Sequence, residues 1–237
     1  MKFDIITIFP KIFDGFLGES LLARAQKKLA QKGRGLASGG KIISIKIHNL
    51  RKWAKDKHKT VDDRPFGGGP GMVMKFEPIY KAATILKSKS NSSSTESGRG
   101  RENKNAKFRS RVILFSPRGK KFTQADVQRL SKYSQLIFIC GRYEGVDERV
   151  ANHVADEVFS IGDYVLNGGE VAAMVLIESI SRMIPSFIAK KESAIKEDFA
   201  QYTRPEVVKI NGKKIAVPKV LLGGNHKEID KWRRTHK

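Results

Sequence analysis

The chain has 237 residues, enough for one α/β core with a small second domain, so neither a repeat array nor a disulfide-stapled miniprotein is needed. Its 46 lysines and arginines against 24 aspartates and glutamates leave a formal charge of +22. That surplus exceeds the ~2–8 charges of a typical small domain, so nucleic acid is the first partner to expect, with adaptation to solubility or salt as the alternative.

The first run of the chain, Met1–Phe9, is apolar but carries Asp4 and lacks the small-residue cleavage site of a signal peptide. No stretch approaches the ~18 apolar residues of a membrane span. The lone cysteine, Cys140, sits in an apolar run, which excludes a disulfide or thiolate metal site within one chain and predicts a buried thiol. We therefore expect a cytoplasmic protein without a membrane partner.

Five short apolar runs alternate with helical patterns and predict strands. They are Phe3–Phe9, Lys41–His48, Arg111–Ser116, Gln135–Gly141 and Glu157–Ile161. Runs that are apolar throughout suit strands buried on both faces, and the alternation favours a mainly parallel sheet flanked by helices. The predicted fold class is α/β.

Two basic segments lack the apolar residues that would offset their ordering entropy. Lys27–Gly40 and the serine-rich Lys87–Arg111 are both predicted to be mobile surface loops, the second forming a low-complexity loop at about residues 87–110. As solvated tails they are expected to add no more than nonspecific attraction to phosphates.

The longest regular helix is predicted over Glu170–Ile184 and is ended by Pro185. Its apolar residues lie nearly all round it, so it must be covered on most sides, by the core alone or by the core and a subunit interface. The predicted organisation is a first domain over residues 1–188, a linker over 189–203, and a basic, mostly helical C-terminal domain over 204–237.

No metal site is predicted, since the five histidines are scattered and none has a His-x-x-x-His partner. A glycine-rich segment, Asp62–Met72, must instead adopt backbone conformations closed to residues with a Cβ. It is either a plain connector or a loop that lies flat against a base or a phosphate. Its candidate substrate-binding residues are Asp62, Arg64, Gly67, Gly68, Gly69, Pro70 and Gly71.

Two further segments combine glycines with the end of a predicted strand. They are Cys140–Arg149 and Ser160–Glu170. Ligands of α/β proteins collect at the carboxyl ends of strands, so the two segments together can wall one pocket. The alternative for the first is a simple strand-to-helix turn, with Asp147 and Glu148 favourably placed at the start of a helix.

Taken together and in order, five strings resemble the bacterial tRNA (guanine(37)-N1)-methyltransferases, from Met1 to about Arg233. They are Asp62–Met72, Ser116–Lys120, Cys140–Val150, Ile161–Glu170 and Tyr202–Val207. The resemblance implies a sheet with a deep trefoil knot, which is a rare exception among folds. It also implies an obligate homodimer with active sites between subunits, tRNA as substrate, and S-adenosylmethionine as methyl donor.

The family's cofactor pocket, carried over residue by residue, implies that S-adenosylmethionine is bound in a bent shape through backbone groups. The implied residues are Phe115, Ser116, Pro117, Gly141, Tyr143, Glu144, Ile161, Gly162, Asp163, Tyr164, Val165, Leu166 and Gly168.

The resemblance also implies the catalytic residues. The family's arginine matches Arg182, although that residue could simply pair with Glu178 on the helix surface. The family's general base is an aspartate in the linker; here Glu197 occupies the aligned position and Asp198 follows it, so either can serve. Such a base removes the N1 proton of guanine, and Arg182 stabilises the charge that develops on O6.

Against the family's pattern, we expect a shortened linker between Phe199 and Tyr202 and a reduced C-terminal domain, which stops soon after Trp232. The family is reported to need Mg²⁺, but no carboxylate cluster in the sequence marks a site for it.

Two other functions compete with the expected one. One is another knotted RNA methyltransferase, acting on a ribose 2′-hydroxyl or a different base, and the other is a noncatalytic RNA-binding protein that has kept the fold.

Overall fold

The computed structural model describes residues 1–27, 42–96, 108–188 and 199–236. The chain divides into two compact units, Met1–Ala189 and Lys190–Lys237, each of which is described by itself. Among the described residues, none of the helices combines the length and the apolar character needed to cross a membrane.

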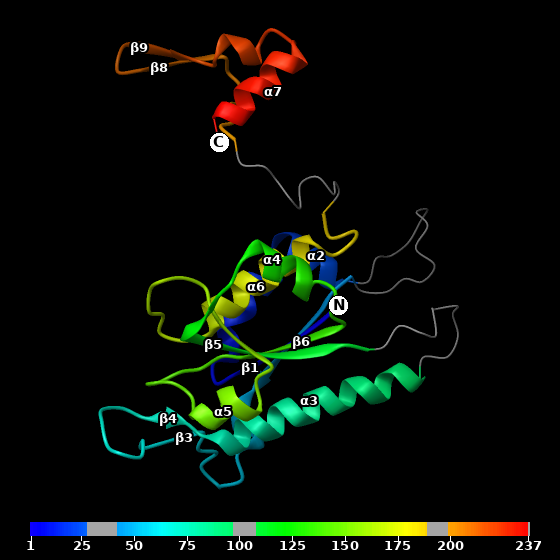
Figure 1. Ribbon diagram of the computed structural model, residues 1–237, viewed down its shortest axis with the longest axis vertical. Coiled ribbons are helices and arrows are strands. Elements are labelled where there is room, and N and C mark those ends of the chain that lie inside the picture. The colour runs from blue at the N-terminus through cyan, green and yellow to red at the C-terminus, as the bar shows by residue number, and fades with distance from the viewer. Residues whose placement is uncertain (28–41, 97–107, 189–198, 237) are drawn as a thin grey trace. The chain divides into compact units, whose positions relative to one another are not determined.

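The first unit is built on a five-stranded sheet in which every neighbouring pair is parallel (Figure 1). Its strand order is β2-β1-β6-β5-β7. The strands are β1 Lys2–Thr7, β2 Ser44–Asn49, β5 Ser110–Lys121, β6 Gln135–Ile139 and β7 Glu157–Ser160. The five predicted strands and the α/β class are therefore confirmed.

The sheet is buried on both faces, as runs that are apolar throughout predict. Along β1, Phe3 and Ile5 join the core on one face, while Ile6 joins the core on the other. The first face is covered by α2 (Ser20–Gln26), α4 (Gln124–Leu130) and α6 (Glu170–Arg182). The second is covered by α3 (Phe76–Glu96) and α5 (Glu148–His153), so helices lie on both sides of the sheet (Figure 1).

Short elements complete the first unit at the connections. After β1 come the 3-10 helix η1 and the helix α1, and after β2 the 3-10 helix η2; the strands β3 and β4 pair antiparallel outside the main sheet. Their bounds are η1 Pro10–Phe13, α1 Asp14–Gly18, η2 Leu50–Trp53, β3 Asp62–Asp63 and β4 Val73–Met74.

Helix α3 corrects one prediction, because it continues to Glu96 where the sequence predicts a loop from Lys87. Its lone proline, Pro78, lies in the first turn, where proline is tolerated, and no glycine interrupts it. Once a helix is nucleated by packing against the core, each further residue adds a hydrogen bond at little cost. At the other end of that predicted loop, β5 already begins at Ser110, while residues 97–107 and most of Lys27–Gly40 lie outside the described residues.

Helix α4 begins with a capping box, in which Thr123 and Asp126 exchange hydrogen bonds with each other's backbone. Asp126 is 2% exposed. Burial raises its pKa, but hydrogen bonds from Lys120, Thr123 and Arg129 outweigh burial and bring the pKa to about 2. Asp126 is therefore ionised and stabilises the start of α4.

Helix α6 ends at Arg182, two residues before the predicted Ile184. Leu176, Ile177 and Ile180 are completely buried. On the opposite side of the helix, Val171 and Val175 are 50% and 41% exposed. The helix is thus apolar on nearly all sides, as predicted, but a single chain leaves one of those sides uncovered.

The second unit contains a hairpin that the prediction of a mostly helical domain missed. Strands β8 (Val207–Ile210) and β9 (Lys213–Ala216) pair antiparallel, followed by the 3-10 helix η4 (Lys219–Leu221) and α7 (His226–Thr235). The turn is Asn211-Gly212, both with positive φ, 49° and 77°. Asn-Gly is the strongest short-range hairpin signal, so this element was open to prediction.

Candidate active site

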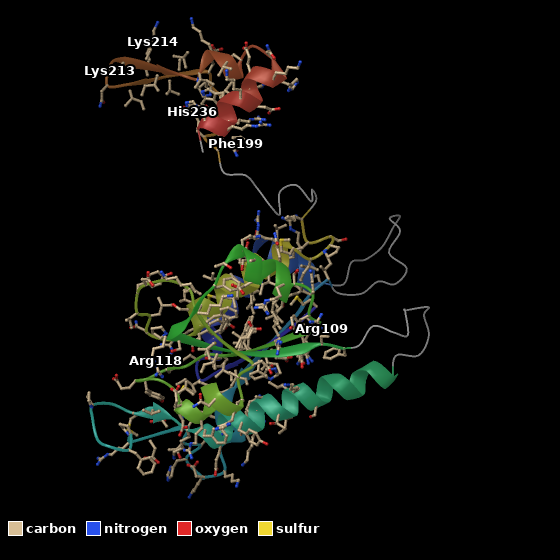
Figure 2. The ribbon with its side chains drawn as sticks, in the orientation of Figure 1. Arg109, Arg118, Phe199, Lys213, Lys214 and His236 are labelled. Carbon is tan, nitrogen blue, oxygen red and sulfur yellow. The ribbon has the colours of Figure 1, made fainter. Side chains whose placement is uncertain are left out.

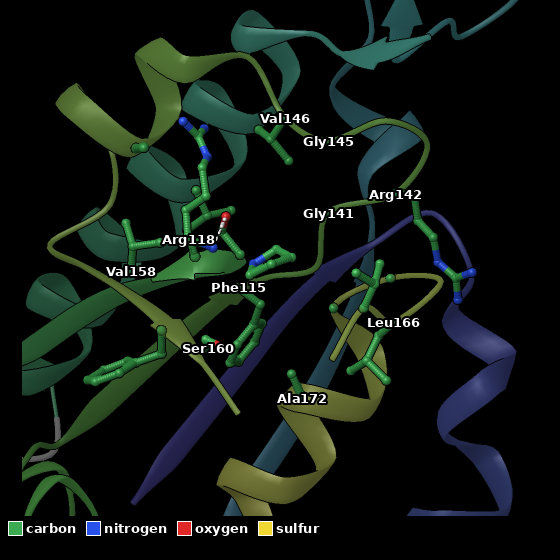
Figure 3. Close-up of a pocket in the computed structure, with 18 of the residues that line it drawn as sticks. Phe115, Arg118, Gly141, Arg142, Gly145, Val146, Val158, Ser160, Leu166 and Ala172 are labelled. Carbon is green, nitrogen blue, oxygen red and sulfur yellow. Dashed lines mark hydrogen bonds between the residues drawn. The ribbon is translucent and has the colours of Figure 1, made fainter. Parts of the chain in front are cut away.

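A pocket of about 660 Å³ opens at the carboxyl ends of β6 and β7 and at an irregularity within β5. Its walls come from three stretches far apart in sequence, within residues 114–118, 141–152 and 158–172, which Figure 3 shows converging around Phe115 and Gly141. Carboxyl ends of parallel strands are where ligands of such folds bind. The two glycine-containing strand ends therefore wall one pocket, as the sequence predicts.

Twelve of the thirteen predicted cofactor-binding residues line this pocket. They are Phe115, Ser116, Pro117, Gly141, Tyr143, Glu144, Ile161, Gly162, Tyr164, Val165, Leu166 and Gly168. The exception is Asp163, which is exposed and pairs with Lys121 instead. The structure thus brings the predicted residues together, while their role in binding a cofactor stays a prediction.

An irregularity in β5 shapes one wall of the pocket. Phe159 of β7 is paired with both Phe115 and Lys120, so the four residues between them leave the ladder and bulge outward. Gly119 permits this path, because a Cβ on it would lie 2.6 to 2.8 Å from the backbone of Phe159. The bulge carries Ser116 and Pro117 into the pocket wall.

Gly169 is a pocket residue that sequence reasoning missed. Its N–H donates to the carbonyl of Gly141 at 3.0 Å, and a Cβ on it would lie 2.8 Å from the Cα of Cys140. At neighbouring Gly168, a Cβ would meet the side chains of Arg142 and Glu170 instead. The sequence Gly168-Gly169 does not show which of the two glycines lies against the backbone of Cys140, because that contact joins segments that are distant in the chain.

A buried ionic network lies behind the pocket. Glu170, 1% exposed, accepts a hydrogen bond from the Thr7 hydroxyl at 2.7 Å and one from the Arg142 Nε at 2.8 Å. Arg142 also lies 4.8 Å from the centre of the Phe9 ring. The network joins the start of α6 to β1. Sequence reasoning gave Arg142 and Glu170 no role, because Thr7 is 163 residues away from Glu170.

An exposed ion pair reaches across the pocket. The side chain of Arg118, on the β5 bulge, extends through the pocket in Figure 3 and pairs with Glu148 at the start of α5. The two side chains are 78% and 56% exposed, and Figure 2 labels Arg118 among the side chains of the first unit. Exposed pairs of this kind contribute about 0–1 kcal/mol, so this one opens readily.

The glycine-rich loop between β3 and β4 is attached to the pocket wall. The predicted unusual backbone is confirmed, since Gly67, Gly68, Gly69 and Gly71 all have positive φ. Glu144 donates its N–H to the Met72 carbonyl at 3.0 Å, and a Cβ on Gly71 would lie 2.5 Å from the Glu144 Cγ. The candidate substrate-binding residues, Asp62 to Gly71, therefore lie beside the pocket and do not line it.

Of the implied catalytic residues, the described part of the chain contains Arg182 alone. Arg182 is half-buried at the end of α6 and does not line the pocket. Glu197 and Asp198 lie outside the described residues. Cys140 is fully buried, and burial, followed by the charge of Glu170, raises the pKa of its thiol. The predicted buried thiol is thus confirmed, and it stays neutral.

A doubly covered parallel sheet with a glycine-walled pocket at its strand ends is the arrangement of enzymes that bind a nucleotide-like cofactor. The family model described as "tRNA (Guanine-1)-methyltransferase TrmD" matches residues 1–237. The chain belongs to this family, which confirms the resemblance inferred from its motifs.

Individual relatives agree with the family match. A protein of Geotalea uraniireducens is 47% identical over 99% of this chain and 84% of its own length. One of Endomicrobium trichonymphae is 45% identical over 98% and 92%, and one of Anoxybacillus flavithermus is 40% identical over 99% and 85%. Each is named tRNA (guanine-N(1)-)-methyltransferase.

Proposed function

We propose that this protein transfers a methyl group from S-adenosylmethionine to N1 of guanine 37, the nucleotide 3′ to the anticodon, in tRNA. The observation that carries the proposal is the gathering of twelve predicted cofactor-binding residues into one pocket of about 660 Å³. That volume suits a cofactor of this size. The chain's membership of the tRNA (guanine-1)-methyltransferase family supports the same reaction.

The pocket suits recognition through the main chain. Gly141 and Gly168 line it, and the adjoining Gly169 packs directly against the backbone after β6. Where side chains are absent, backbone N–H and C=O groups can reach the edge of a planar ring. S-adenosylmethionine supplies an activated methyl group, so much of the remaining barrier is the positioning of the two reactants.

The proton on guanine N1 must leave before N1 can attack the methyl group, which requires a base within hydrogen-bond reach. We assign this role to Glu197 or Asp198 in the linker. Arg182 is assigned to stabilise the negative charge that builds on O6. Both assignments rest on the positions that these residues share with the family's motifs.

The position of Arg182 supports a homodimer. Arg182 lies twelve residues after Glu170 on α6, a distance of about 18 Å along the helix axis at 1.5 Å per residue. Since the pocket adjoins the start of that helix, an arginine side chain at its end does not reach the pocket of the same chain. We therefore propose that Arg182 acts in the pocket of a second subunit, and that the exposed Val171 and Val175 lie in the interface.

Mixed dimers test this arrangement. Arg182→Ala and Gly141→Val subunits are each inactive alone, but random mixing makes about half of the dimers mixed, each with one intact composite site. About a quarter of the unaltered activity should then return. If activity stays at the level of the separate variants, the two residues belong to one chain's site.

The deep trefoil knot stays a prediction, and the cytoplasm is the proposed compartment. Mg²⁺ is retained only as an accompanying ion, since among the described residues no group of three or more His, Cys, Asp or Glu side chains offers it a site.

The experiment that tests the function is transfer of a labelled methyl group from S-adenosylmethionine to tRNA transcripts that differ only at position 37. The label should appear with guanine at that position and be absent with any other base. Label that persists after the replacement indicates a ribose hydroxyl or another base as target. Binding of tRNA without any transfer indicates a noncatalytic RNA-binding protein.

A further inference from the structure

A densely basic segment follows β2 and lies outside the pocket. Between Arg51 and Thr60 the chain has five lysines and arginines and a single acidic residue, Asp56. With Lys81 of α3, these basic residues form what we call the lysine face. Its members are Arg51, Lys52, Lys55, Lys57, Lys59 and Lys81.

The lysine face is held in place by packing. Leu50 is fully buried in the core beneath α3, where Trp53 and Ala54 also pack. The Arg51 side chain then donates to the Lys59 carbonyl at 3.2 Å and closes the segment on itself. The lysines therefore project from a defined backbone and not from a freely moving tail.

The charges of this face are not neutralised within the described part of the chain. The Asp56 carboxylate accepts hydrogen bonds from the Thr60 N–H at 3.0 and 3.1 Å and is turned toward the backbone. Among the described residues, no carboxylate comes within ion-pair distance of Lys55 or Lys81. Partial desolvation, followed by the charge of nearby Lys55, lowers the pKa of Lys81, while Glu77 one turn earlier opposes the shift.

The lysine face is directly connected to the candidate active site. Thr60 is followed by Val61, whose carbonyl accepts the Lys75 N–H at 2.8 Å, and then by β3. Met74 of β4 in turn pairs with Val146 in the pocket wall. A polyanion bound to the lysine face would therefore lie close to the glycine-rich loop and to the pocket beside that loop.

We propose that the lysine face binds the phosphodiester backbone of the tRNA substrate and so strengthens tRNA binding beside the pocket. Two neighbouring ammonium groups repel each other unless an anion lies between them, and a phosphate supplies a full charge with two free oxygens. Several lysines held on one folded segment can contact neighbouring phosphates of a strand. This inference rests on the proposed function, because that function makes tRNA the polyanion.

The test compares two double variants that remove the same charge from the first unit. Lys55→Gln/Lys81→Gln alters the lysine face, while Lys27→Gln/Lys132→Gln removes two lysines next to α2 and α4, on the other face of the sheet. Binding of a fluorescently labelled tRNA transcript is measured by anisotropy over a range of salt concentrations. Cofactor affinity and the methylation rate at saturating tRNA are measured in parallel.

The variant Lys55→Gln/Lys81→Gln should bind tRNA about tenfold more weakly than the unaltered protein at physiological salt. In a plot of log affinity against log salt concentration, its slope should be less steep by about 2. Lys55→Arg/Lys81→Arg should keep normal binding, and cofactor affinity and the saturated rate should not change. Equal losses in both glutamine variants would show an effect of net charge alone and overturn the proposal, as would unchanged binding. Because binding is read directly, it remains interpretable even if the unaltered protein transfers no methyl group.

Discussion

Replacing Gly169 by alanine tests whether the pocket depends on the close contact between the start of α6 and the backbone of Cys140. Gly169 has φ −78° and ψ −5°, which alanine adopts without strain, so the substitution adds only the volume of one methyl group. That methyl carbon would lie 2.8 Å from the Cα of Cys140, 3.2 Å from the Gly141 nitrogen and 3.3 Å from the Phe115 Cβ. Against a favourable carbon–carbon separation of about 3.5 Å, the shortest contact is too close by about 0.7 Å.

The start of α6 has to move to relieve that contact. Cys140 is fully buried and its N–H donates to the Ile6 carbonyl at 3.0 Å, so β6 is held within the sheet. Overpacking of this kind typically costs about 1–3 kcal/mol. The same displacement carries Leu166 and Gly168 away from their places in the pocket wall. We expect Gly169→Ala to lower the free energy of unfolding by that amount and to weaken S-adenosylmethionine binding at least about tenfold.

Calorimetric titration with S-adenosylmethionine and urea unfolding measure the two effects. The matched control is Gly15→Ala in α1, where an added Cβ meets nothing within 4 Å. Alanine is favoured in a helix, so the control should be neutral or slightly stabilising and bind the cofactor normally. Unchanged affinity and stability in Gly169→Ala would refute the argument that this glycine sets the distance between α6 and the sheet.

Three further outcomes follow from other parts of the structure. Arg118→Gln should release S-adenosylmethionine several-fold faster in stopped-flow measurements, because the Arg118–Glu148 pair crosses the pocket. The free energy of unfolding should change by less than about 1 kcal/mol. An unchanged release rate would contradict this role of the pair. The folded-state pKa of Asp126 is about 2, against 3.8 ordinarily. Its contribution of about 2 kcal/mol to the free energy of unfolding is therefore present above pH 4 and is lost as the pH falls toward 2. In Asp126→Asn, the free energy of unfolding should depend less steeply on pH across that window. Of Glu197→Gln and Asp198→Asn, one should lower the single-turnover methylation rate by about 10²–10⁴ with binding little changed, and normal rates in both would exclude the linker carboxylates as the base.

Local patterns predicted the features that depend on local physics. The five strands could be predicted because a short run of continuous apolar residues is typical of a strand that is buried on both faces of a sheet. The conformations at Gly67 to Gly71 could be foreseen because positive φ is closed to most other residues. The Asn211-Gly212 turn belongs to the same class and was open to the same kind of prediction.

Other features depend on contacts that no local pattern contains. Helix α3 runs through a serine-rich segment to Glu96, because packing of its first turns on the core provides the nucleus that the segment itself lacks. The network of Thr7, Arg142 and Glu170 joins three segments that meet only in the folded chain. Separately, Thr7 is an ordinary strand residue, Arg142 is typical of an exposed turn, and Glu170 is typical of the start of a helix.

The pocket itself combines both kinds of information. Motif resemblance selected Gly168, but the backbone contact belongs to Gly169, because α6 approaches the sheet at the residue that faces Cys140. That approach is possible only where three features coincide. They are a strand that ends at Ile139, just before Cys140, a bulge in β5 that begins after Phe115, and a helix that begins at Glu170. A shift of one residue in any of them would place a side chain where the pocket now exposes main chain. The register of the sheet therefore determines which glycine is indispensable, and register is a property of the assembled strands.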